Sequence, residues 1–426
     1  MLPTGFTIIE NLKKFPEMKF LYNIFIFFYH LFIRFAALFN PKAKLWLNGR
    51  KNIFSEIEKK IIGTPKIIWI HCASLGEFEQ GRPLIEEIKQ KFSNYKILLT
   101  FFSPSGYEIR KNYSGADFIF YLPMDTAANA KKFISMVKPS MALFVKYEFW
   151  FNYLNTLKNN KIPTYLVSGI FRENHYFFNW YGTWFRKQLS AFTFFFLQDE
   201  TSEKLLNSIG YTNTKITGDT RFDRVLAISK NTEQIDLITL FKGNKKIILA
   251  GSTWNPDEKI ISPINFSQAN YKLIIAPHEV NENHIEIIRK QFSKNNLLCF
   301  SQANSENILT ADVLIIDNIG MLSSLYQYAE IAFIGGGFGK GIHNILEAAT
   351  FGMPIIFGPN NAKFKEANDL LKLGVAFTVE SSERFEKIFF SLAKNEIERN
   401  EITKNARSYI EENCGATASI LNNIQL

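Results

Sequence analysis

Apolar segments of strand length alternate with stretches of helical periodicity from residue 65 onward. Residues 66–73 (KIIWIHCA) and 96–102 (KILLTFF) are apolar at nearly every position, which is typical of strands covered on both faces. The first run leads into residues 78–92, which have helical spacing. Further strands are expected at 118–122, 141–145, 164–168 and 192–197. This alternation predicts a doubly wound α/β domain with a parallel sheet.

A second series of the same kind begins near Gly218. Its expected strands are 246–250, 272–276, 313–316, 331–334 and 354–357, with helical patterns at 321–330 and 345–351. The final stretch, 382–414, is helical in pattern and adds no strand. We predict two Rossmann-like domains, at 46–215 and 216–426, after an N-terminal segment at 1–45; the last helices have the option of packing back on the first domain. Ligands of such sheets bind beyond the carboxyl ends of the strands, so two facing domains would place a site in a cleft.

The N-terminal segment contains one long apolar stretch, residues 20–39 (FLYNIFIFFYHLFIRFAALF). It is long enough to span a bilayer as a helix. Lys19, Asn23, His30 and Arg34 follow one another at spacings of four, seven and four, so they share one helical face. This narrow polar stripe favours a helix that lies in the membrane interface. A true span and a buried core helix stay open, whereas a cleaved signal peptide is not expected because no small-residue cleavage site follows.

Charge adds to the case for a membrane surface. Residues 1–60 hold ten Lys or Arg and four Glu, which gives +6 of the chain's net charge of +9. A basic segment suits phospholipid or nucleic acid, and the apolar residues between these charges favour the membrane. The 42 Phe fit either an AT-rich genome or a lipid-contacting surface. The three cysteines lack a CxxC spacing and the six His are scattered, so a reducing cytosolic compartment fits best and no metal centre is expected.

A short motif, Ser74-Leu75-Gly76-Glu77, follows the first predicted strand. Gly76 would permit a tight turn from strand to helix, and Glu77 would then stand at a helix start on the carboxyl edge of the sheet. A carboxylate in that place can accept a proton from a substrate hydroxyl. The competing interpretation is an acidic residue that only complements the helix dipole.

A glycine-rich segment, residues 335–341 (GGGFGKG), follows the strand predicted at 331–334. Glycines let backbone N–H groups approach a phosphate closely, and the next helix offers its N-terminus to the anion. The segment is neither a Walker loop nor the standard dinucleotide fingerprint. We expect His343 to donate to a phosphate and Glu347, four residues on and on the same helical face, to accept from ribose hydroxyls. The alternative for Glu347 is a solvated residue on a helix surface.

Other loops follow strands of the second series. Gly251-Ser252-Thr253 would supply hydroxyls and amides, or simply cap a helix. Pro277-His278-Glu279 and Gly358-Pro359-Asn360 are expected at the same edge. Arg221, within the segment GDTRFD at 218–223, is a candidate to stabilise a leaving phosphate.

Taken in order, the segments 74–77, 218–223, 335–337 and 341–347 resemble the motifs of the Kdo transferase family. Its members move 3-deoxy-D-manno-octulosonic acid (Kdo) from CMP-Kdo to a lipid A precursor. The resemblance extends from about residue 40 to residue 420. Three further segments are similar to the family's Y-x-P-x-D, E-x-E-x-W and G-P-x-x-x-N-F stretches: Tyr121-Leu122-Pro123-Met124-Asp125, Glu148-Phe149-Trp150, and Gly358-Pro359 with Phe364.

The resemblance implies a GT-B fold, a location on the cytoplasmic face of the bacterial inner membrane, and inversion at the Kdo anomeric carbon. CMP-Kdo would be the donor substrate, with no further cofactor and no bound metal; the chain also lacks any D-x-D sequence. Glu77 would be the general base, with Ser74, Gly76 and Glu148 on the acceptor side. The donor site would comprise Ser252, Thr253, Pro277, His278, Gly336, Gly337, His343, Asn344 and Glu347.

Four positions depart from the family pattern. Lys146 stands where the first Glu of E-x-E-x-W is usual, and Arg221 stands where a Lys is usual, which keeps the charge but changes its geometry. Pro277-His278-Glu279 takes the place of P-R-H, and Ile342 that of the second Gly in G-G-H-N. These changes affect the acceptor side more than the donor pocket.

The expected reaction is inverting glycosyl transfer to a lipid A precursor, with Glu77 as the base. One alternative is another GT-B transferase or an epimerase that uses a UDP-sugar. Another is a non-catalytic membrane protein that binds a nucleotide sugar. No nucleic-acid-binding motif accompanies the positive charge, so no nucleic-acid partner is expected.

Overall fold

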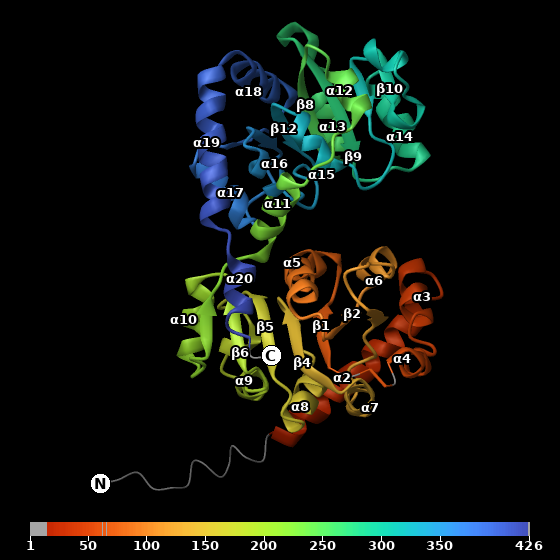
Figure 1. The fold of residues 1–426 in the computed structure, drawn as a ribbon, viewed down its shortest axis with the longest axis vertical. Coiled ribbons are helices and arrows are strands. Elements are labelled where there is room, and N and C mark those ends of the chain that lie inside the picture. Colours follow the sequence, from red (N-terminus) through yellow and green to blue (C-terminus); the bar gives the residue numbers. More distant parts are fainter. Residues whose placement is uncertain (1–14, 62, 65, 425–426) are drawn as a thin grey trace, which may run out of the picture. The chain divides into compact units, whose positions relative to one another are not determined.

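The computed structural model describes residues 15–61, 63–64 and 66–424, so the first part of the predicted N-terminal segment lies outside the described residues. The chain divides into two compact units. Unit 1 comprises Met1–Asp223 and Gly415–Leu426, and unit 2 comprises Arg224–Cys414. Each unit contains one seven-stranded sheet with helices around it (Figure 1).

The sheet of unit 1 has the strand order β3-β2-β1-β4-β5-β6-β7, and every paired strand is parallel. All six strands predicted in this half are present. The seventh strand, β7, was not predicted, because its three residues are too short to form a recognisable apolar run. The strands are β1 (Ile67–Cys72), β2 (Lys96–Phe101), β3 (Phe118–Tyr121), β4 (Pro139–Val145), β5 (Thr164–Gly169), β6 (Phe194–Leu197) and β7 (Thr214–Ile216).

Helices connect these strands and cover the sheet. The helix that follows β1 begins slightly earlier than the spacing at 78–92 predicts, because Ser74 caps it. The helices of unit 1 are α2 (Phe15–Ala36), α3 (Pro41–Asn48), α4 (Ile53–Ile61), α5 (Leu75–Lys91), α6 (Pro104–Arg110), α7 (Ala127–Val137), α8 (Phe151–Asn159), α9 (Thr183–Leu189), α10 (Glu200–Ser208) and α20 (Ala416–Leu421). Helix α11 (Thr220–Lys230) runs across the division between the units.

Unit 2 repeats the arrangement with the strand order β10-β11-β9-β8-β12-β13-β14, again parallel. The five strands predicted here are present, and the two that were not predicted, β10 and β14, are three-residue strands at the sheet's edges. The strands are β8 (Lys246–Thr253), β9 (Tyr271–Pro277), β10 (Leu297–Cys299), β11 (Val313–Ile315), β12 (Ile331–Ile334), β13 (Ile355–Phe357) and β14 (Ala376–Thr378).

The helices of unit 2 follow the predicted pattern with one difference. The helical pattern at 321–330 is realised as a single turn, α15 (Leu322–Leu325), followed by the 3-10 turn η5 (Tyr326–Tyr328). The others are α12 (Asp236–Lys242), α13 (Asn255–Ile261), α14 (Glu282–Gln291), α16 (Leu346–Phe351), α17 (Lys365–Lys372), α18 (Ser382–Lys394) and α19 (Glu396–Glu412).

The N-terminal helix α2 lies against unit 1 by one face. The phenol of Tyr22 donates to the Asp125 carboxylate at 2.6 Å, and the Asn152 amide donates to the Asn23 side chain at 3.1 Å. Ile26 and Ile33 are buried in a small core on the same side. Part of the predicted polar stripe therefore faces the protein rather than a membrane surface, while Lys19 and Arg34 are exposed.

Asp125 is almost fully buried, and burial raises the pKa of its carboxyl to about 6. The Tyr22 hydroxyl and the backbone N–H groups of Asn152 and Tyr153 donate to it and act in the opposite direction. One carboxylate thus connects α2 with the first turn of α8.

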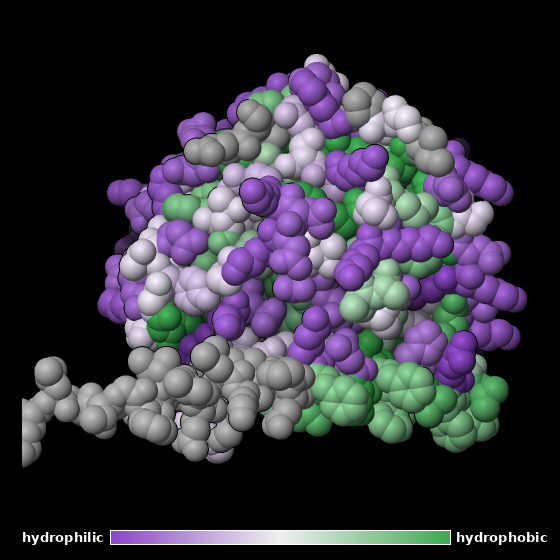
Figure 2. All heavy atoms as spheres, turned by 90° about the horizontal axis from the view of Figure 1, so that it is seen from below, coloured by the Kyte–Doolittle hydropathy of each residue, from purple (hydrophilic) through white to green (hydrophobic). Residues whose placement is uncertain are grey.

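The opposite face of α2 is apolar and exposed. Figure 2 shows it as a green band beside the residues drawn in grey. Among the described residues, α2 contains the one stretch long and apolar enough to cross a membrane, and only 11% of that stretch is buried. The buried core helix considered from the sequence is therefore wrong. The exposed side chains of this apolar face are Phe20, Leu21, Phe25, Phe27, Phe28, Leu31, Phe32 and Phe35, followed by Leu38 and Phe39.

The bond between Tyr22 and Asp125 can be tested by Tyr22→Phe, which removes the hydroxyl and keeps the ring. A hydrogen bond to a charged group contributes about 1.5–3 kcal/mol, so we expect α2 to detach more often from unit 1. The measurement is amide hydrogen exchange, which should become faster across α2 and stay unchanged in β1 and β4. Tyr181→Phe, at a tyrosine that is 50% exposed, is the control. Unchanged exchange in α2 would contradict this role for Tyr22.

Candidate functional site

Two acidic residues stand at the carboxyl edge of the sheet in unit 1. Strands β1 and β4 are neighbours, and the strand order reverses between them. Such a switch point opens a crevice beyond the strand ends, where ligands of doubly wound sheets bind. Glu77 follows β1 and Glu148 follows β4. The sheet therefore brings together two of the residues predicted on the acceptor side.

The Glu77 carboxylate takes part in a capping box at the start of α5. Its Oε2 atom accepts from the backbone N–H of Ser74 at 3.0 Å and from the Ser74 hydroxyl. These contacts satisfy donors that the helix start would leave unpaired. Glu77 therefore has a structural role at the start of α5, as the competing interpretation expects. Among the described residues, no hydrogen bond reaches Oε1. The half-buried carboxylate is thus held in position with one oxygen available to a substrate hydroxyl.

Gly76 has a different role from the one its sequence position suggests. It lies inside the first turn of α5 and is not among the glycines with positive φ. A Cβ built there would meet only the Ser74 hydroxyl, at 3.7 Å. A tight turn is therefore not what requires glycine here. Gly76 is exposed, and its missing side chain leaves open space next to Glu77.

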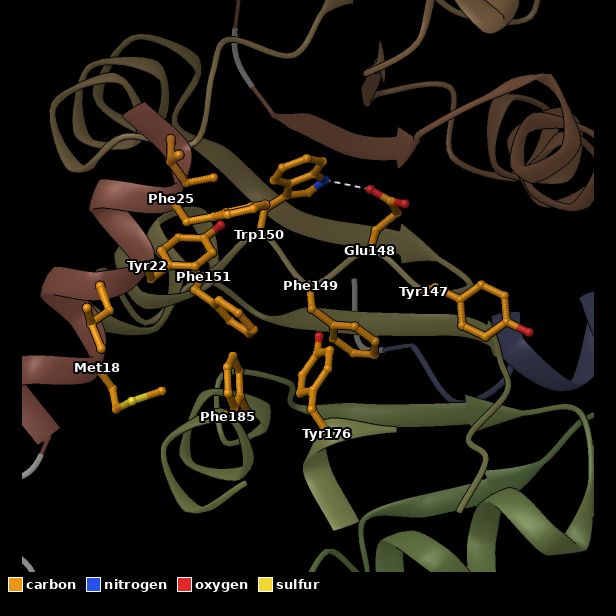
Figure 3. Close-up of a pocket in the computed structure, with 12 residues that line it drawn as sticks. Met18, Tyr22, Phe25, Tyr147, Glu148, Phe149, Trp150, Phe151, Tyr176 and Phe185 are labelled. Atoms are coloured by element: carbon orange, nitrogen blue, oxygen red, sulfur yellow. Dashed lines mark hydrogen bonds between the residues drawn. The ribbon is translucent and has the colours of Figure 1, made fainter. Parts of the chain in front are cut away.

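Glu148 belongs to a hydrogen-bonded group that the sequence did not reveal. The indole N–H of Trp150 donates to Glu148 Oε2 at 2.5 Å (Figure 3). The Nε2 atom of the fully buried His71 lies 3.2 Å from the same oxygen. On the other side of the ring, His71 Nδ1 lies 2.9 Å from the Thr100 hydroxyl, which accepts from the indole of Trp69.

The contacts around His71 are compatible with a proton on Nε2. Because the Thr100 oxygen accepts from Trp69, its own hydrogen is available for His71 Nδ1. Two groups lie near Nε2: the Glu148 carboxylate at 3.2 Å, which can only accept, and the Trp150 indole N–H at 3.1 Å, which also donates to Glu148. A histidine whose two nitrogens are both engaged holds the acid rigidly. The sequence signal for His71 was a lone polar residue near the end of an apolar strand.

Glu77 and Glu148 follow adjacent strands and act electrostatically on the same neighbour. The thiol of Cys72 has its pKa raised by burial and, in addition, by the charges of both carboxylates. Tyr147 has its pKa raised chiefly by burial; Arg172 acts in the opposite direction, and Asp199 and Glu77 act in the same direction as burial. Glu77, Tyr147 and Glu148 therefore form one electrostatic group at the switch point of unit 1.

Three aromatic rings form a cluster at the corresponding edge of unit 2. The His278 ring stacks on both Trp254 and His343, with ring centroids 4.6 Å and 4.3 Å away. The Trp254 indole N–H donates to His343 Nε2 at 3.0 Å. Trp254 follows β8, His278 follows β9 and His343 follows the loop after β12. Trp254 was not predicted, although it directly follows the Ser252-Thr253 pair.

His343 is held in its neutral form. Burial, together with the neighbouring His278, lowers its pKa to about 4. Since Nε2 accepts from Trp254, the proton is on Nδ1, and that atom is the one able to donate to a phosphate oxygen. The expected donation from His343 to a phosphate is thus compatible with the geometry. The lowered pKa means, however, that His343 would donate as a neutral imidazole at neutral pH.

The helical relationship predicted between His343 and Glu347 is wrong. Helix α16 begins only at Leu346, so His343 and Asn344 precede it. Asn344 reaches Glu347 instead, with its amide donating to Oε1 at 3.1 Å, while the Ser323 hydroxyl donates to Oε2 at 2.8 Å. The half-buried Glu347 is a positioned carboxylate rather than a solvated surface residue.

The glycines after β12 are explained by close packing. A Cβ at Gly335 would come within 2.3 Å of the Ser252 carbonyl oxygen, and one at Gly337 within 2.5 Å of the Gly358 nitrogen. At Gly336, where φ is +91°, it would meet the Gly341 carbonyl oxygen at 2.4 Å. The loop amides also have partners within unit 2: Gly335, Gly336, Gly339, Gly341 and His343 donate to protein oxygens.

The remaining predicted donor residues divide into two groups. Ser252 is half-buried at φ 54° beside the glycine loop, and Pro277 ends β9 immediately before His278. Thr253 is fully buried, and its hydroxyl donates to Glu258 at 2.9 Å. Its side chain is therefore not presented to a ligand, because it satisfies a buried carboxylate that also contacts His284.

Arg221 belongs to unit 1, whereas every predicted donor residue belongs to unit 2. Its guanidinium pairs with Asp219 at 2.8 Å, and Asp219 also accepts from the Gln80 amide. Among the described residues, no group of three or more His, Cys, Asp or Glu side chains is placed to hold a metal ion.

Comparison with known proteins identifies relatives over most of the chain. The family described as "3-Deoxy-D-manno-octulosonic-acid transferase (kdotransferase)" matches residues 47–224. The 3-deoxy-D-manno-octulosonic acid transferase of Aquifex aeolicus is 30% identical over 322 residues, which cover 74% of this chain and 82% of the relative. The enzyme of the same name from Haemophilus influenzae is 26% identical and covers 84% and 86%.

A bifunctional glycosyltransferase/methyltransferase from Fusobacterium nucleatum is also similar, with 27% identity over 90% of this chain. The match spans only 61% of that relative's length.

Solved structures share the fold. UDP-GlcNAc 2-epimerase from Neisseria meningitidis superposes with a TM-score of 0.58 at 15% identity, covering 84% of this chain and 98% of the epimerase. MurG from Acinetobacter baumannii gives 0.52 at 13% identity, with coverage of 85% and 99%. These likenesses confirm the predicted GT-B architecture of two Rossmann-like units.

The state of His343 can be measured by NMR titration of the imidazoles, since the chain has six His. We expect His343 to titrate near pH 4 and its pKa to rise in His278→Gln, because His278 contributes to the lowering. His30→Gln, on α2, is the control and should leave His343 unchanged. The unfolded chain protonates this histidine near pH 6.5, so its contribution to stability should be lost as pH falls from about 6.5 toward about 4. Titration of His343 near pH 6.5 in the folded protein would contradict the buried, neutral cluster.

Proposed function

The chain belongs to the 3-deoxy-D-manno-octulosonic acid (Kdo) transferase family, and on this basis we propose that it transfers Kdo from CMP-Kdo to a lipid A precursor. The proposed site of action is the cytoplasmic face of the bacterial inner membrane. The observation that carries the proposal is the position of Glu77, a carboxylate fixed through Oε2 at the switch point of a doubly wound unit, whose Oε1 receives no hydrogen bond from the described residues.

In the proposed reaction, Glu77 accepts the proton of an acceptor hydroxyl. The resulting oxygen attacks the anomeric carbon of Kdo, the bond from that carbon to the CMP phosphate breaks, and CMP leaves with the bonding electrons. Attack from the face opposite the leaving group inverts the anomeric centre. A carboxylate positioned by two contacts from Ser74 suits a general base, because it needs no reorganisation before proton transfer.

Unit 2 supplies the proposed CMP-Kdo site. Its polar groups converge at the β8–β12 switch point, as expected for a ligand of this fold. His343 Nδ1 is a neutral donor for the phosphate, and Glu347 is a carboxylate suited to ribose hydroxyls. The stacked rings of Trp254 and His278 form a flat aromatic wall beside them.

The exposed face of α2 supports the membrane location. A long apolar helical face beside basic residues is suited to lie in the interface of an anionic bilayer. Trp180, which precedes α9, is 90% exposed. Helix α9 itself packs against α2, with the ring centroids of Trp184 and Tyr22 5.9 Å apart. Exposed tryptophans are frequent at the level of lipid headgroups.

Glu77→Gln separates the two roles of this residue. The amide oxygen of Gln can still accept from Ser74, so the capping of α5 and the thermal stability should be kept. The loss of the base should lower kcat for Kdo transfer by roughly 10²–10⁴-fold. Glu87→Gln, on the same helix, is the matched control and should retain activity. Near-normal transfer by the purified Glu77→Gln variant would refute the proposed mechanism.

Nucleotide preference tests the donor. Calorimetric titration of the wild-type chain should show tighter binding of CMP than of UDP. Trp254→Leu should weaken CMP binding if the aromatic wall contributes to the site, while Trp180→Leu should not. Preference for UDP would overturn the Kdo assignment in favour of a UDP-sugar enzyme.

A further inference from the structure

Unit 1 contains an apolar pocket of about 510 Å³ beside α2. Met18, Leu21 and Phe25 of α2 line one wall, and Figure 3 shows Phe151 and Phe185 facing them across the pocket. Residues three and four positions apart share a helix face, so one side of α2 forms this wall without a break. The volume is in the range of small-ligand sites, about 300–1,000 Å³.

The pocket is continuous with the exposed apolar face of α2. Leu21 and Phe25 belong to both, and they are 53% and 61% exposed. At the other end the lining includes Glu148 and Trp150 (Figure 3). The pocket therefore leads from the surface proposed to meet the membrane toward the acidic group at the end of β1 and β4.

A second pocket, of about 490 Å³, adjoins the first and has the opposite character. Tyr147, Phe149 and Tyr176 line both pockets. Lys146 and Arg172 line the second pocket alone, and none of its described lining residues is acidic. The lining of the second pocket is therefore positively charged, and this basic pocket lies next to the apolar pocket.

The backbone conformation at the end of β4 positions Lys146 at the basic pocket. It leaves β4 in the left-handed region, with φ 69°, and its N–H donates to the Val167 carbonyl at 2.8 Å. A lysine in this conformation carries a conformational cost, which the pairing of β4 with β5 offsets. The family resemblance predicts Glu at this position, so the basic character of the pocket is a property of this chain.

An apolar pocket that shares a wall with a basic one is complementary to an amphiphile with an anionic headgroup. We propose that the two pockets form an acceptor subsite, in which the apolar pocket takes part of one acyl chain and Lys146 with Arg172 pairs with a phosphate on the sugar headgroup. This inference rests on the proposed transfer to a lipid acceptor. It places the headgroup between the membrane-facing helix and the Glu77–Glu148 edge.

The basic pocket is tested by Lys146→Gln and Arg172→Gln in the full chain, assayed for Kdo transfer to a phosphorylated and a dephosphorylated acceptor. Each variant should raise KM for the phosphorylated acceptor by roughly tenfold, the effect of losing about 1.4 kcal/mol of binding. KM for the dephosphorylated acceptor, KM for CMP-Kdo and kcat should stay near the wild-type values. Lys161→Gln is the matched control, because Lys161 is an exposed lysine of unit 1 that also has positive φ.

The apolar pocket is tested by Leu21→Trp, which fills it while keeping α2 apolar. KM should rise for an acceptor with long acyl chains and change little for one with short chains. Leu31→Trp is the control: Leu31 is 50% exposed on the same helix and does not line the pocket. Equal effects of the two tryptophans would point to general membrane contact and overturn the acyl assignment.

Two outcomes separate this inference from the proposed function. If the wild-type chain transfers Kdo but Lys146→Gln and Arg172→Gln leave KM for both acceptors unchanged, only the subsite is refuted. If the wild-type chain transfers nothing from CMP-Kdo, the proposed function fails first. Binding to phosphatidylglycerol vesicles that lack acceptor supplies a third arm: a loss in Lys146→Gln as large as the loss of acceptor affinity would assign the cations to bulk lipid and overturn the subsite.

Discussion

Every strand in both sheets runs parallel to its neighbours, so the carboxyl ends of all strands in a unit open on one edge. Parallel pairing requires a crossover connection after each strand, and the residues that begin these connections gather at that edge. The strand order reverses once in each sheet, between β1 and β4 and between β8 and β12. The crossovers diverge there and leave room beyond the strand ends. Glu77 and Glu148 in unit 1, and Ser252 and the glycine loop in unit 2, stand at these two points because of the topology alone.

This constraint explains why positions far apart in the sequence act together. Between Glu77 in α5 and Glu148 lie three strands (β2, β3 and β4) and two helices (α6 and α7), yet the two acids follow adjacent strands. The same holds for Trp254, His278 and His343, which follow three different strands and form one cluster. In both units the polar groups are also tied to the local structure: Glu77 caps α5, and His343 accepts from Trp254. Local structural roles and the proposed chemistry are therefore carried by the same atoms.

The sequence predicts most of the fold because buried parallel strands are continuous apolar runs, which are easy to recognise. It does not predict β7, β10 and β14, because three residues at a sheet edge carry too little pattern. Glu77 could be placed at a strand end from motif and position, and Glu148 was found through the family resemblance. Glu347 was predicted to lie in a helix, as it does, but not beside His343 on one helical face. His71, Trp150 and Trp254 could not be placed in this way, since their importance comes from partners that only the sheet register supplies. The pattern of α2 identified a polar stripe that includes Asn23 but not the contacts of the helix. Asn152 donates to Asn23 and Asp125 accepts from Tyr22, and both partners lie more than a hundred residues away in sequence, beyond the reach of any local pattern.

Asp125 shows how the apolar helix and the acceptor side are coupled. Its carboxylate accepts from Tyr22 on α2 and from the first-turn amides of α8, and the segment directly before α8 carries Glu148 and Trp150. A shift of α2 would change the donors around a buried carboxylate whose pKa is already raised to about 6 by burial, and an unpaired charge there would be costly. The position of α2 and the position of Glu148 are therefore linked through one group. The Y-x-P-x-D segment that resembles a family motif then has a structural reason: Asp125 holds the exposed apolar helix α2 in place beside the acidic edge of Glu77 and Glu148.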